Sequence, residues 1–470
     1  MSYNSTSRKE ILEHARLLLG NSLRGLYQEV LQTYKGKGGL GVCVEELHFK
    51  YTPNSKSNPD FPEAGVELKC TPLKKNKDGS LVSKERLVLN IIDYTKEADA
   101  DFETSSFWKK NQLLLLLFYL HESDKDFVEF VFKIVRYWKF PEEDLKIIKD
   151  DWAVIHKKIV SGEAHTLSEG DTFYLGACVK GLRGGGNKRK QYRTEILADQ
   201  RAYSLKSKYL NTIILDALSH PEMVSEAVGL SPRQKEKIKQ EKAKIESIVQ
   251  SVKDYIDGET FEQLIERKFS PYYGSTIYEI EKSLDRQITS SPKAISNAVV
   301  HAILGVESPK ISEFEKANIQ QKSIRLESNG RLREAMSFSR IQYDDLMLEE
   351  VWEESVWYSI LTMRFLFVIF RKSEDGDDKA AVLEKVFFWT MPYQDLEKAK
   401  LFWLDTRNKV RKGIFDQFMS SKSNNICHVR PKARNAQDLM QTASFGSQKK
   451  NAYWLNRGYI WKIISKYLGV

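Results

Sequence analysis

The chain has 470 residues, is 41% hydrophobic and carries a formal net charge of +9. This length allows two or three domains with apolar cores, and the positive charge favours an anionic partner. The longest apolar run, residues 113–120, is too short to cross a bilayer, and the four cysteines lack Cys-x-x-Cys spacing, which excludes a membrane protein and a zinc or disulfide scaffold. The polar N-terminus has no signal-peptide pattern, so we expect a cytoplasmic protein.

The first predicted element is a helix that begins after Ser7, where Ser-x-x-Glu spacing precedes an apolar run. A glycine-rich turn and an apolar helix follow within residues 35–50. A lysine-rich hairpin containing Asp78 and Gly79 is expected to join the next two strands. The predicted strands cover residues 64–73, 86–94 and 111–120.

A highly charged segment, residues 219–258, separates two halves of the chain. Its apolar residues recur at helical spacing between Ile238 and Ile256. The pattern predicts an amphipathic helix that connects two domains, and the alternative is a surface helix within one domain.

The second half of the sequence weakly repeats the first. Trp152 and Trp403 are each followed by an aliphatic residue and a glycine at the same spacings, and residues 202–214 resemble residues 452–464. Matching blocks in the same order favour a tandem duplication. We therefore expect a catalytic domain at 1–218, a charged helical linker at 219–258 and a related second domain at 259–470.

Two carboxylates and a lysine surround an apolar pair in residues 58–72. Because side chains alternate along a strand, Glu67 and Lys69 should share one face, while Asp60 arrives from the preceding loop. Converging carboxylates suit a cation such as Mg²⁺, and a neighbouring lysine can stabilise charge on a phosphate. This pattern is typical of metal-assisted phosphodiester hydrolysis. A solvated Glu-Lys face on a half-exposed strand is the alternative.

Three motifs in order, at residues 37–45, 60–72 and 103–116, resemble the MutH family. That family contains a mismatch-repair nicking endonuclease and the Sau-type restriction enzymes that cut at GATC. The resemblance to the Sau-type enzymes runs over essentially the whole chain. It implies an α/β fold with two tandem restriction-endonuclease-like domains, each a mixed sheet flanked by helices.

The resemblance also implies roles for individual residues. Asp60 and Glu67 match the metal-binding carboxylates, and Lys69 matches the catalytic lysine. Glu45 matches a further acidic residue at the metal site, directly or through water, and Lys110 matches a second active-site lysine. Without the resemblance, Glu45 could be a surface helix residue and Lys110 could simply flank a strand.

The second copy is expected to have lost this chemistry. We align Ile324 and Leu326 with Val66 and Leu68 of the first copy. In this alignment the second copy has no carboxylate cluster, and about Leu361 falls at the position of Lys110. The positions of Glu45, Asp60, Glu67 and Lys69 are then taken by His301, Asn318, Arg325 and Glu327. An inactive domain of this kind is a candidate for DNA binding.

Basic residues interleaved with tyrosines and glycines predict contact with DNA. The loop at 180–193 has six basic residues and no acid, and glycines let backbone N–H groups approach phosphates. A mobile solvated loop is the alternative. The family resemblance implies base recognition near an Arg-Pro-Lys sequence, which survives only in the second copy. The candidate DNA-contact residues are Lys180, Arg183, Tyr203, Lys206, Arg430, Lys432, Tyr453 and Arg457.

The sequence therefore predicts a type II restriction endonuclease that needs Mg²⁺ and acts on double-stranded DNA. The resemblance implies cutting before the G of GATC, with the second domain binding another copy of the site as an effector. One intact site per chain implies self-association on DNA, or sequential nicking, because both strands of a palindrome must be cut. A restriction system also implies a companion methyltransferase. The alternatives are a mismatch-repair-type nicking enzyme and a non-catalytic sequence-specific DNA-binding protein.

Overall fold

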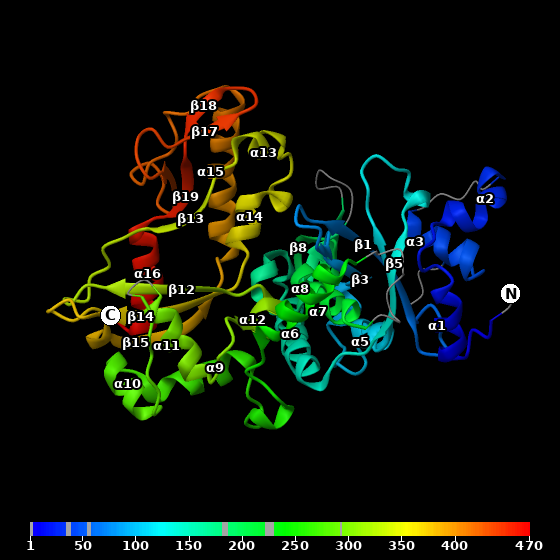
Figure 1. Cartoon of the computed structure of the whole chain (residues 1–470), viewed down its shortest axis with the longest axis horizontal. Helices are drawn as coiled ribbons and strands as arrows, with labels where there is room; N and C mark the ends of the chain where they lie inside the picture. Colours follow the sequence, from blue (N-terminus) through cyan, green and yellow to red (C-terminus); the bar gives the residue numbers. More distant parts are fainter. Residues whose placement is uncertain (1–2, 34–38, 54–57, 181–186, 221–229, 292–293) are drawn as a thin grey trace. The chain divides into compact units, whose positions relative to one another are not determined.

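The chain folds into two compact units in a computed structural model (Figure 1). The structure describes residues 3–33, 39–53, 58–180, 187–220, 230–291 and 294–470. Unit 1 contains Met1–Asp254 and Ser308–Asn318, and unit 2 contains Tyr255–Glu307 and Ile319–Val470. Within the described residues, no helix is long and apolar enough to span a membrane.

The main sheet of unit 1 has the strand order β2-β1-β4-β5. β1 and β4 are parallel, whereas β1–β2 and β4–β5 are antiparallel. β4 is the leucine-rich run, and its first five residues are buried, as expected for a central strand covered on both faces. The bounds are β1 (Glu67–Lys75), β2 (Leu81–Ser83), β4 (Leu114–Leu120) and β5 (Phe132–Trp138).

Helices near the N-terminus cover one face of this sheet (Figure 1). α1 begins where the Ser7 hydroxyl accepts a hydrogen bond from the Glu10 N–H, and its Ile11 and Ala15 are buried. These side chains pack in one apolar core with Leu68 of β1 and with residues of β4 and β5. The helices are α1 (Arg8–Arg16), α2 (Leu23–Thr33), α3 (Leu40–Cys43) and the π-helix η1 (Val44–His48).

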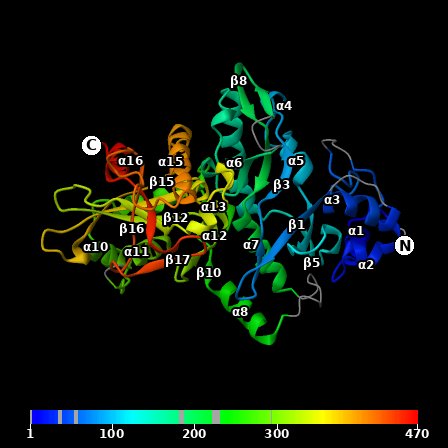
Figure 2. The ribbon, with the colours of Figure 1, turned by 90° about the horizontal axis from the view of Figure 1, so that it is seen from above.

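A second sheet in unit 1 has the order β3-β9-β6, and α5 lies beside β3 (Figure 2). The sequence predicted that residues 86–94 would pair with the strand at 64–73 through the lysine-rich hairpin. This pairing is wrong, because the hairpin returns into the short strand β2 and β3 pairs with β9. The bounds are β3 (Leu87–Ile91), β6 (Leu175–Val179), β9 (Arg201–Leu205), α4 (Tyr94–Glu97), α5 (Ser106–Asn111), α6 (Glu142–Val160) and α7 (Ser207–Leu218).

Within its described residues, 219–220 and 230–258, the charged segment does not form one long helix, and residues 221–229 lie outside the described part of the chain. α8 covers only Pro232–Ala243, and it has no buried residue. Helix formation ends there because the backbone N–H groups of Ile248 and Val249 donate to the carboxylate of Glu313, each at 3.1 Å. The remaining small elements of unit 1 are β7 (Lys188–Gln191), β8 (Thr194–Asp199), β10 (Ile245–Glu246), β11 (Lys310–Ile311) and α12 (Ser312–Ala317).

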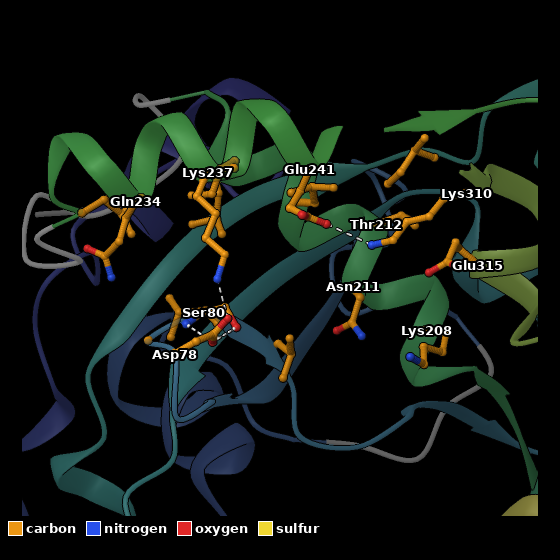
Figure 3. Close-up of a pocket in the computed structure, with 18 residues that line it drawn as sticks. Asp78, Ser80, Lys208, Asn211, Thr212, Gln234, Lys237, Glu241, Lys310 and Glu315 are labelled. Atoms are coloured by element: carbon orange, nitrogen blue, oxygen red, sulfur yellow. Dashed lines mark hydrogen bonds and ion pairs between the residues drawn. The ribbon is translucent and has the colours of Figure 1, made fainter. Parts of the chain in front are cut away.

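α8 instead docks on unit 1, where it borders a cavity of about 460 Å³ (Figure 3). The Lys237 ammonium lies 2.5 Å from Asp78 of the β1–β2 turn, and the Lys310 ammonium lies 2.9 Å from Glu241. The charged face of this segment is therefore held by ion pairs within unit 1.

Unit 2 contains sheets with the orders β12-β14-β15 and β13-β19-β16. β12 and β14 are parallel and β14 and β15 antiparallel, as are β1 with β4 and β4 with β5 in unit 1. The strands are β12 (Gln320–Leu326), β13 (Met336–Arg340), β14 (Phe365–Arg371), β15 (Val382–Trp389), β16 (Cys427–Pro431), β17 (Leu439–Thr442), β18 (Gly446–Lys449) and β19 (Asn451–Leu455).

An aromatic-rich core holds unit 2 together, with Trp357 and Trp403 nearly fully buried. Trp357 stacks on Tyr453 with ring centroids 4.6 Å apart. The helices are α9 (Phe261–Phe269), α10 (Ile277–Ser283), α11 (Ile295–Leu304), α13 (Tyr343–Leu348), α14 (Val356–Leu361), α15 (Tyr393–Arg411) and α16 (Arg457–Leu468).

Candidate active site

A tight fold-back brings the loop before β1 against the start of that strand. Phe61 and Val66 exchange two backbone hydrogen bonds, at 2.9 and 3.2 Å. Gly65 sits in this turn with a φ of 64°, a left-handed conformation that glycine adopts without strain. The Arg8 side chain secures the turn through a 2.7 Å hydrogen bond to the Ala64 carbonyl. Asp60 precedes Phe61 and Glu67 follows Val66, so this backbone pairing brings Asp60 and Glu67 together.

Asp60 and Glu67 are linked through their backbones. The Asp60 N–H donates to Oε2 of Glu67 at 3.1 Å, and the Leu68 N–H donates to Oδ2 of Asp60 at 2.9 Å. These bonds fix both carboxyl groups at the beginning of β1. The structure thus brings together the two carboxylates that the sequence pattern selected.

Two lysines complete the cluster. The Lys69 ammonium lies 2.6 Å from Oε1 of Glu67, and the Lys110 ammonium lies 3.5 Å from the same oxygen. The Glu67 side chain is only 1% exposed, and the lysine side chains are 17% and 14% exposed. The two ammonium groups compensate the charge of the buried Glu67 carboxylate, and the lysine side chains are the more exposed members of the cluster.

Glu45 belongs electrostatically to the same cluster. It lies on the π-helix η1, a rare helix form that recurs at functional sites. Burial, followed by the charge of Asp60, raises the pKa of Glu45 to about 7, while Lys69 lowers it. Burial also raises the pKa of Glu67 to about 7, against the lowering effect of Lys69 and with a further rise from Asp60. The charges of Asp60, Lys69 and Lys110 therefore act on both Glu45 and Glu67.

Tyr51 is a member of this site that the sequence reasoning missed. Its hydroxyl is buried and has no hydrogen-bond partner among the described residues. Burial and then the charges of Asp60, Glu45 and Glu67 raise the pKa of Tyr51. Tyr51 and Asp60 also line one cavity of about 590 Å³. No local sequence signal marks this tyrosine, because it follows η1 without a motif of its own.

An amide pair positions Lys110, and the sequence reasoning did not single it out. α5 begins where the Ser105 hydroxyl accepts from the Trp108 N–H. At its other end, the buried Asn111 amide donates to the Phe107 carbonyl at 2.8 Å and to Asn90 of β3 at 2.9 Å. α5 is thereby fixed to β3 with Lys110 directed at Glu67.

The side chains fit a hard divalent cation. In the described part of the chain, no three His, Cys, Asp or Glu side chains are grouped closely enough to hold a metal ion, so Glu45 does not complete such a group with Asp60 and Glu67. Asp60 and Glu67 supply a smaller set of carboxylate oxygens, and sites that leave positions for water and phosphate have this composition. A cation would offset the repulsion between Asp60 and Glu67, and the orphaned Tyr51 hydroxyl could bind a water in its shell.

Three of the expected DNA-contact residues are buried, so the expectation is wrong for them. Tyr203 is fully buried and donates to Glu97 Oε1 at 2.9 Å. Lys206 donates to the Thr172 carbonyl, and Tyr453 stacks on Trp357. The interleaved tyrosines and lysine belong to the cores of their units, because β9 and β19 are central strands.

The other candidates remain accessible or lie outside the described residues. Lys180 and Arg457 are exposed, and Arg430 is exposed over the Trp454 ring at 5.2 Å. Lys432 is half-buried. Arg183 lies outside the described residues. Contact of these residues with DNA stays a prediction.

The strand ladders give unit 2 a different register from the expected one. Glu67 opposes Leu114 in unit 1, and Gln320 opposes Phe365 in unit 2, each at the first pair of a parallel ladder. The last pairs agree too: His121 N–H donates to the Leu73 carbonyl, and Lys372 N–H donates to the Leu326 carbonyl, both at 3.0 Å. By this pairing, Gln320 occupies the place of Glu67, and Lys322 occupies the place of Lys69.

Arg325 and Glu327 therefore do not stand at the positions expected for them. Arg325 pairs with Asp378 at 2.6 Å, and Glu327 pairs with Lys372 at 2.9 Å. By ladder position, the neutral Gln320 corresponds to Glu67, and a lysine, Lys322, corresponds to Lys69. The alignment of the two sequences was wrong because apolar residues alternate with the same period of two in both strands. Val66 and Leu68 could therefore be matched with Ile324 and Leu326 in the wrong register.

The other expected counterparts lie in helical regions. Asn318 ends α12 in a left-handed conformation with φ 56°. His301 is half-buried on α11, and its equivalence to Glu45 stays a prediction. α5 and α14 are each capped by a serine. Counting from these caps, Ile360 holds the position in α14 that Lys110 holds in α5, and the expected Leu361 is its neighbour.

Comparison with known proteins identifies relatives of this chain. The family model described as DNA mismatch repair enzyme MutH matches residues 49–151, which include Asp60, Glu67, Lys69 and Lys110. The type II restriction enzyme Sau3AI of Staphylococcus aureus is 34% identical over 458 residues, covering 90% of this chain and 87% of that protein. The DNA mismatch repair protein MutH of Buchnera aphidicola subsp. Baizongia pistaciae (strain Bp) is 23% identical over 203 residues, covering 41% of this chain and 91% of that protein.

Proposed function

This chain belongs to the MutH family as a type II restriction endonuclease, and we propose that it cuts both DNA strands at GATC, before the G, with Mg²⁺. It is a site-specific deoxyribonuclease, and its homologues act on DNA. The observation that carries the proposal is the contact of Lys69 with Glu67 beside Asp60.

In this proposal, the chain's own residues prepare a phosphodiester for attack by water. Asp60 and Glu67 would hold Mg²⁺, with Glu45 contributing directly or through a water. The bound ion would act as a Lewis acid at the scissile phosphate. Lys69 and Lys110 stabilise negative charge on the phosphate oxygens, and Lys69 orients the water. A bond then forms between the water oxygen and phosphorus while one phosphorus–oxygen ester bond breaks. The attacking water loses a proton, and the leaving oxygen takes up a proton and departs as a hydroxyl group.

We assign unit 2 an effector role in DNA binding, as a degenerate copy of unit 1. The shared strand orders support a duplication, since the two units have corresponding parallel and antiparallel pairs. The curated MutH relative covers only 41% of this chain, about one unit. Gln320 in the place of Glu67 removes a carboxylate that a cation site needs. Unit 2 would bind a second copy of the recognition sequence without cutting it.

The same proposal covers the remaining partners. One intact site per chain requires two chains to meet on a palindrome, or one chain to cut its strands in sequence. A companion methyltransferase would protect the host's own sites.

Substitution of the two carboxylates tests the site assignment. Asp60→Asn and Glu67→Gln should lower the cutting rate by roughly 10²–10³-fold or more while DNA binding is retained. Glu63→Gln is the matched control, because Glu63 is exposed in the same turn. Normal cutting by both variants would refute the assignment, and loss of cutting by the control would point to a folding effect.

A further inference from the structure

Lys322 of unit 2 is a retained lysine without its acidic partner. It stands at the ladder position of Lys69, and Gln320 stands at the position of Glu67. Lys69 contacts Glu67 at 2.6 Å, whereas no carboxylate pairs with the Lys322 ammonium among the described residues. The ammonium lies 5.2 Å from the centre of the Phe338 ring. The duplication has therefore kept the cation of the site and lost the anion.

A second cation lies close to Lys322. The Lys432 ammonium donates to the Ser337 hydroxyl at 3.1 Å and to the Phe338 carbonyl at 2.6 Å, so it is fixed on the strand that carries the Phe338 ring. Burial and then the charge of Lys432 lower the pKa of Lys322. Two half-buried cations without a carboxylate repel one another, and a bound anion would remove that repulsion.

A cavity of about 540 Å³ opens beside these groups. Lys322, Ser337 and Lys372 line it, and β12 is the edge strand of its sheet, so within the described residues only an isolated bridge, from Leu326 to Leu332, pairs with its free edge. Arg325 and Lys372, which also line the cavity, are neutralised by Asp378 and Glu327. Arg333 and Glu334 add one exposed charge of each sign to its lining. Among the described residues, Lys322 in the lining and Lys432 beside Ser337 are half-buried cations that no carboxylate neutralises, so both can attract an anion.

We propose that Lys322 and Lys432 bind a backbone phosphate of DNA directly, in the place where unit 1 would use a metal ion. This inference rests on the proposed function, since it assumes that unit 2 binds DNA. A neutral glutamine at the position of Glu67 lets the phosphate approach without a bridging cation. Lysine binds phosphate as a point charge, so no further geometry is required of the site.

Amine labelling of the full chain tests the inference at a single residue. Asp60→Asn is present in every arm to prevent cutting, and an acetylating reagent is followed by peptide mass spectrometry. A duplex containing GATC should slow labelling of Lys322 by about tenfold, relative to the exposed Lys398 of α15. Inorganic phosphate is a separate arm. Protection by phosphate but not by duplex would overturn the assignment to DNA.

Two lysines of the same cavity provide matched variants. Lys322→Gln should weaken duplex binding about tenfold and lower the slope of log affinity against log salt by about one. Lys372→Gln should leave both unchanged, because Glu327 already neutralises Lys372. If the parent chain binds duplex but Lys322 stays fully reactive and Lys322→Gln binds normally, the inference is wrong and the proposed function stands. Absence of duplex binding by the parent chain would refute both. The labelling experiment leaves Lys322 unchanged. If Lys322→Gln fails to fold, protection of Lys322 by duplex supports the inference, and full reactivity of Lys322 overturns it.

Discussion

The Lys69 ammonium lies 2.6 Å from a Glu67 carboxylate that is 1% exposed, with the two side chains on the same face of β1. Such a pair is stable only because each charge compensates the other in a site with little water. The contact also explains why a strand near the protein interior can carry a carboxylate.

Lys69→Gln should slow cutting strongly without preventing DNA binding. Loss of a cation that stabilises developing phosphate charge should slow the reaction by roughly 10²–10³-fold. The measurement is a single-turnover cleavage rate beside a binding isotherm. Lys74→Gln is the control, because Lys74 is exposed on the same strand. Equal rates for the two variants would show that Lys69 has no role in catalysis.

Tyr51→Phe should separate activity from stability. The hydroxyl has no partner among the described residues, so its removal should leave the free energy of unfolding unchanged or raise it by up to about 1 kcal/mol. Cutting should fall by about tenfold, because the hydroxyl lies at the acidic cluster, where it can hold a water. Cleavage rates and urea unfolding check the two effects. A variant that cuts at the normal rate would remove Tyr51 from the site.

His48 should make unit 1 sensitive to acid. Burial lowers the pKa of His48 to about 4. Its ring accepts a hydrogen bond from the Tyr27 hydroxyl at 2.8 Å and donates one to the His14 carbonyl at 2.9 Å. The unfolded chain protonates first, near pH 6.5, so the stabilisation is complete above that pH and is lost as the pH falls towards 4. The full effect is about 3 kcal/mol.

The comparison with His48→Phe isolates this effect from other titrations. Urea unfolding between about pH 7 and pH 5 should show a smaller loss of stability in the variant than in the parent chain. Parallel pH dependences in the two proteins would show that His48 is not the group responsible.

Tyr203→Phe should affect folding and not DNA binding. Tyr203 donates to the buried Glu97, and loss of this bond should lower the free energy of unfolding by about 1–3 kcal/mol. Arg430→Gln should do the reverse, because Arg430 is exposed. Unfolding curves and duplex affinities of both variants decide the point. Weak DNA binding by a stable Tyr203→Phe protein would restore the original prediction for this tyrosine.

Much of the geometry of the candidate active site could be predicted from the sequence. The alternation around Val66 and Leu68 placed Glu67 and Lys69 on one face, and the structure brings Asp60 beside them. The leucine-rich run became the central strand β4, because an apolar run of that length can be buried on both faces. The fold-back between Phe61 and Val66 could not be foreseen, since it depends on two backbone hydrogen bonds.

Other features escaped the sequence because different structures share one local pattern. Both faces of β1 are largely buried, so apolar alternation did not fix the register of β12, and Lys322 was overlooked. Tyrosines among basic residues occur both in DNA interfaces and in a protein core covered by surface lysines. Tyr203 and Tyr453 are buried in the cores of their units. Tyr51 acquired its environment only through tertiary contact with Asp60 and Glu67.

Digestion of an unmethylated plasmid, with and without Mg²⁺, followed by sequencing of the cut ends, tests the central claim most directly. We expect discrete linear fragments that begin at GATC, only when Mg²⁺ is present. Nicked circles without linear product would contradict double-strand cutting and favour the nicking alternative. Intact plasmid in both arms, across enzyme and salt concentrations, would contradict the assignment of Asp60, Glu67 and Lys69 as a DNA-cutting centre.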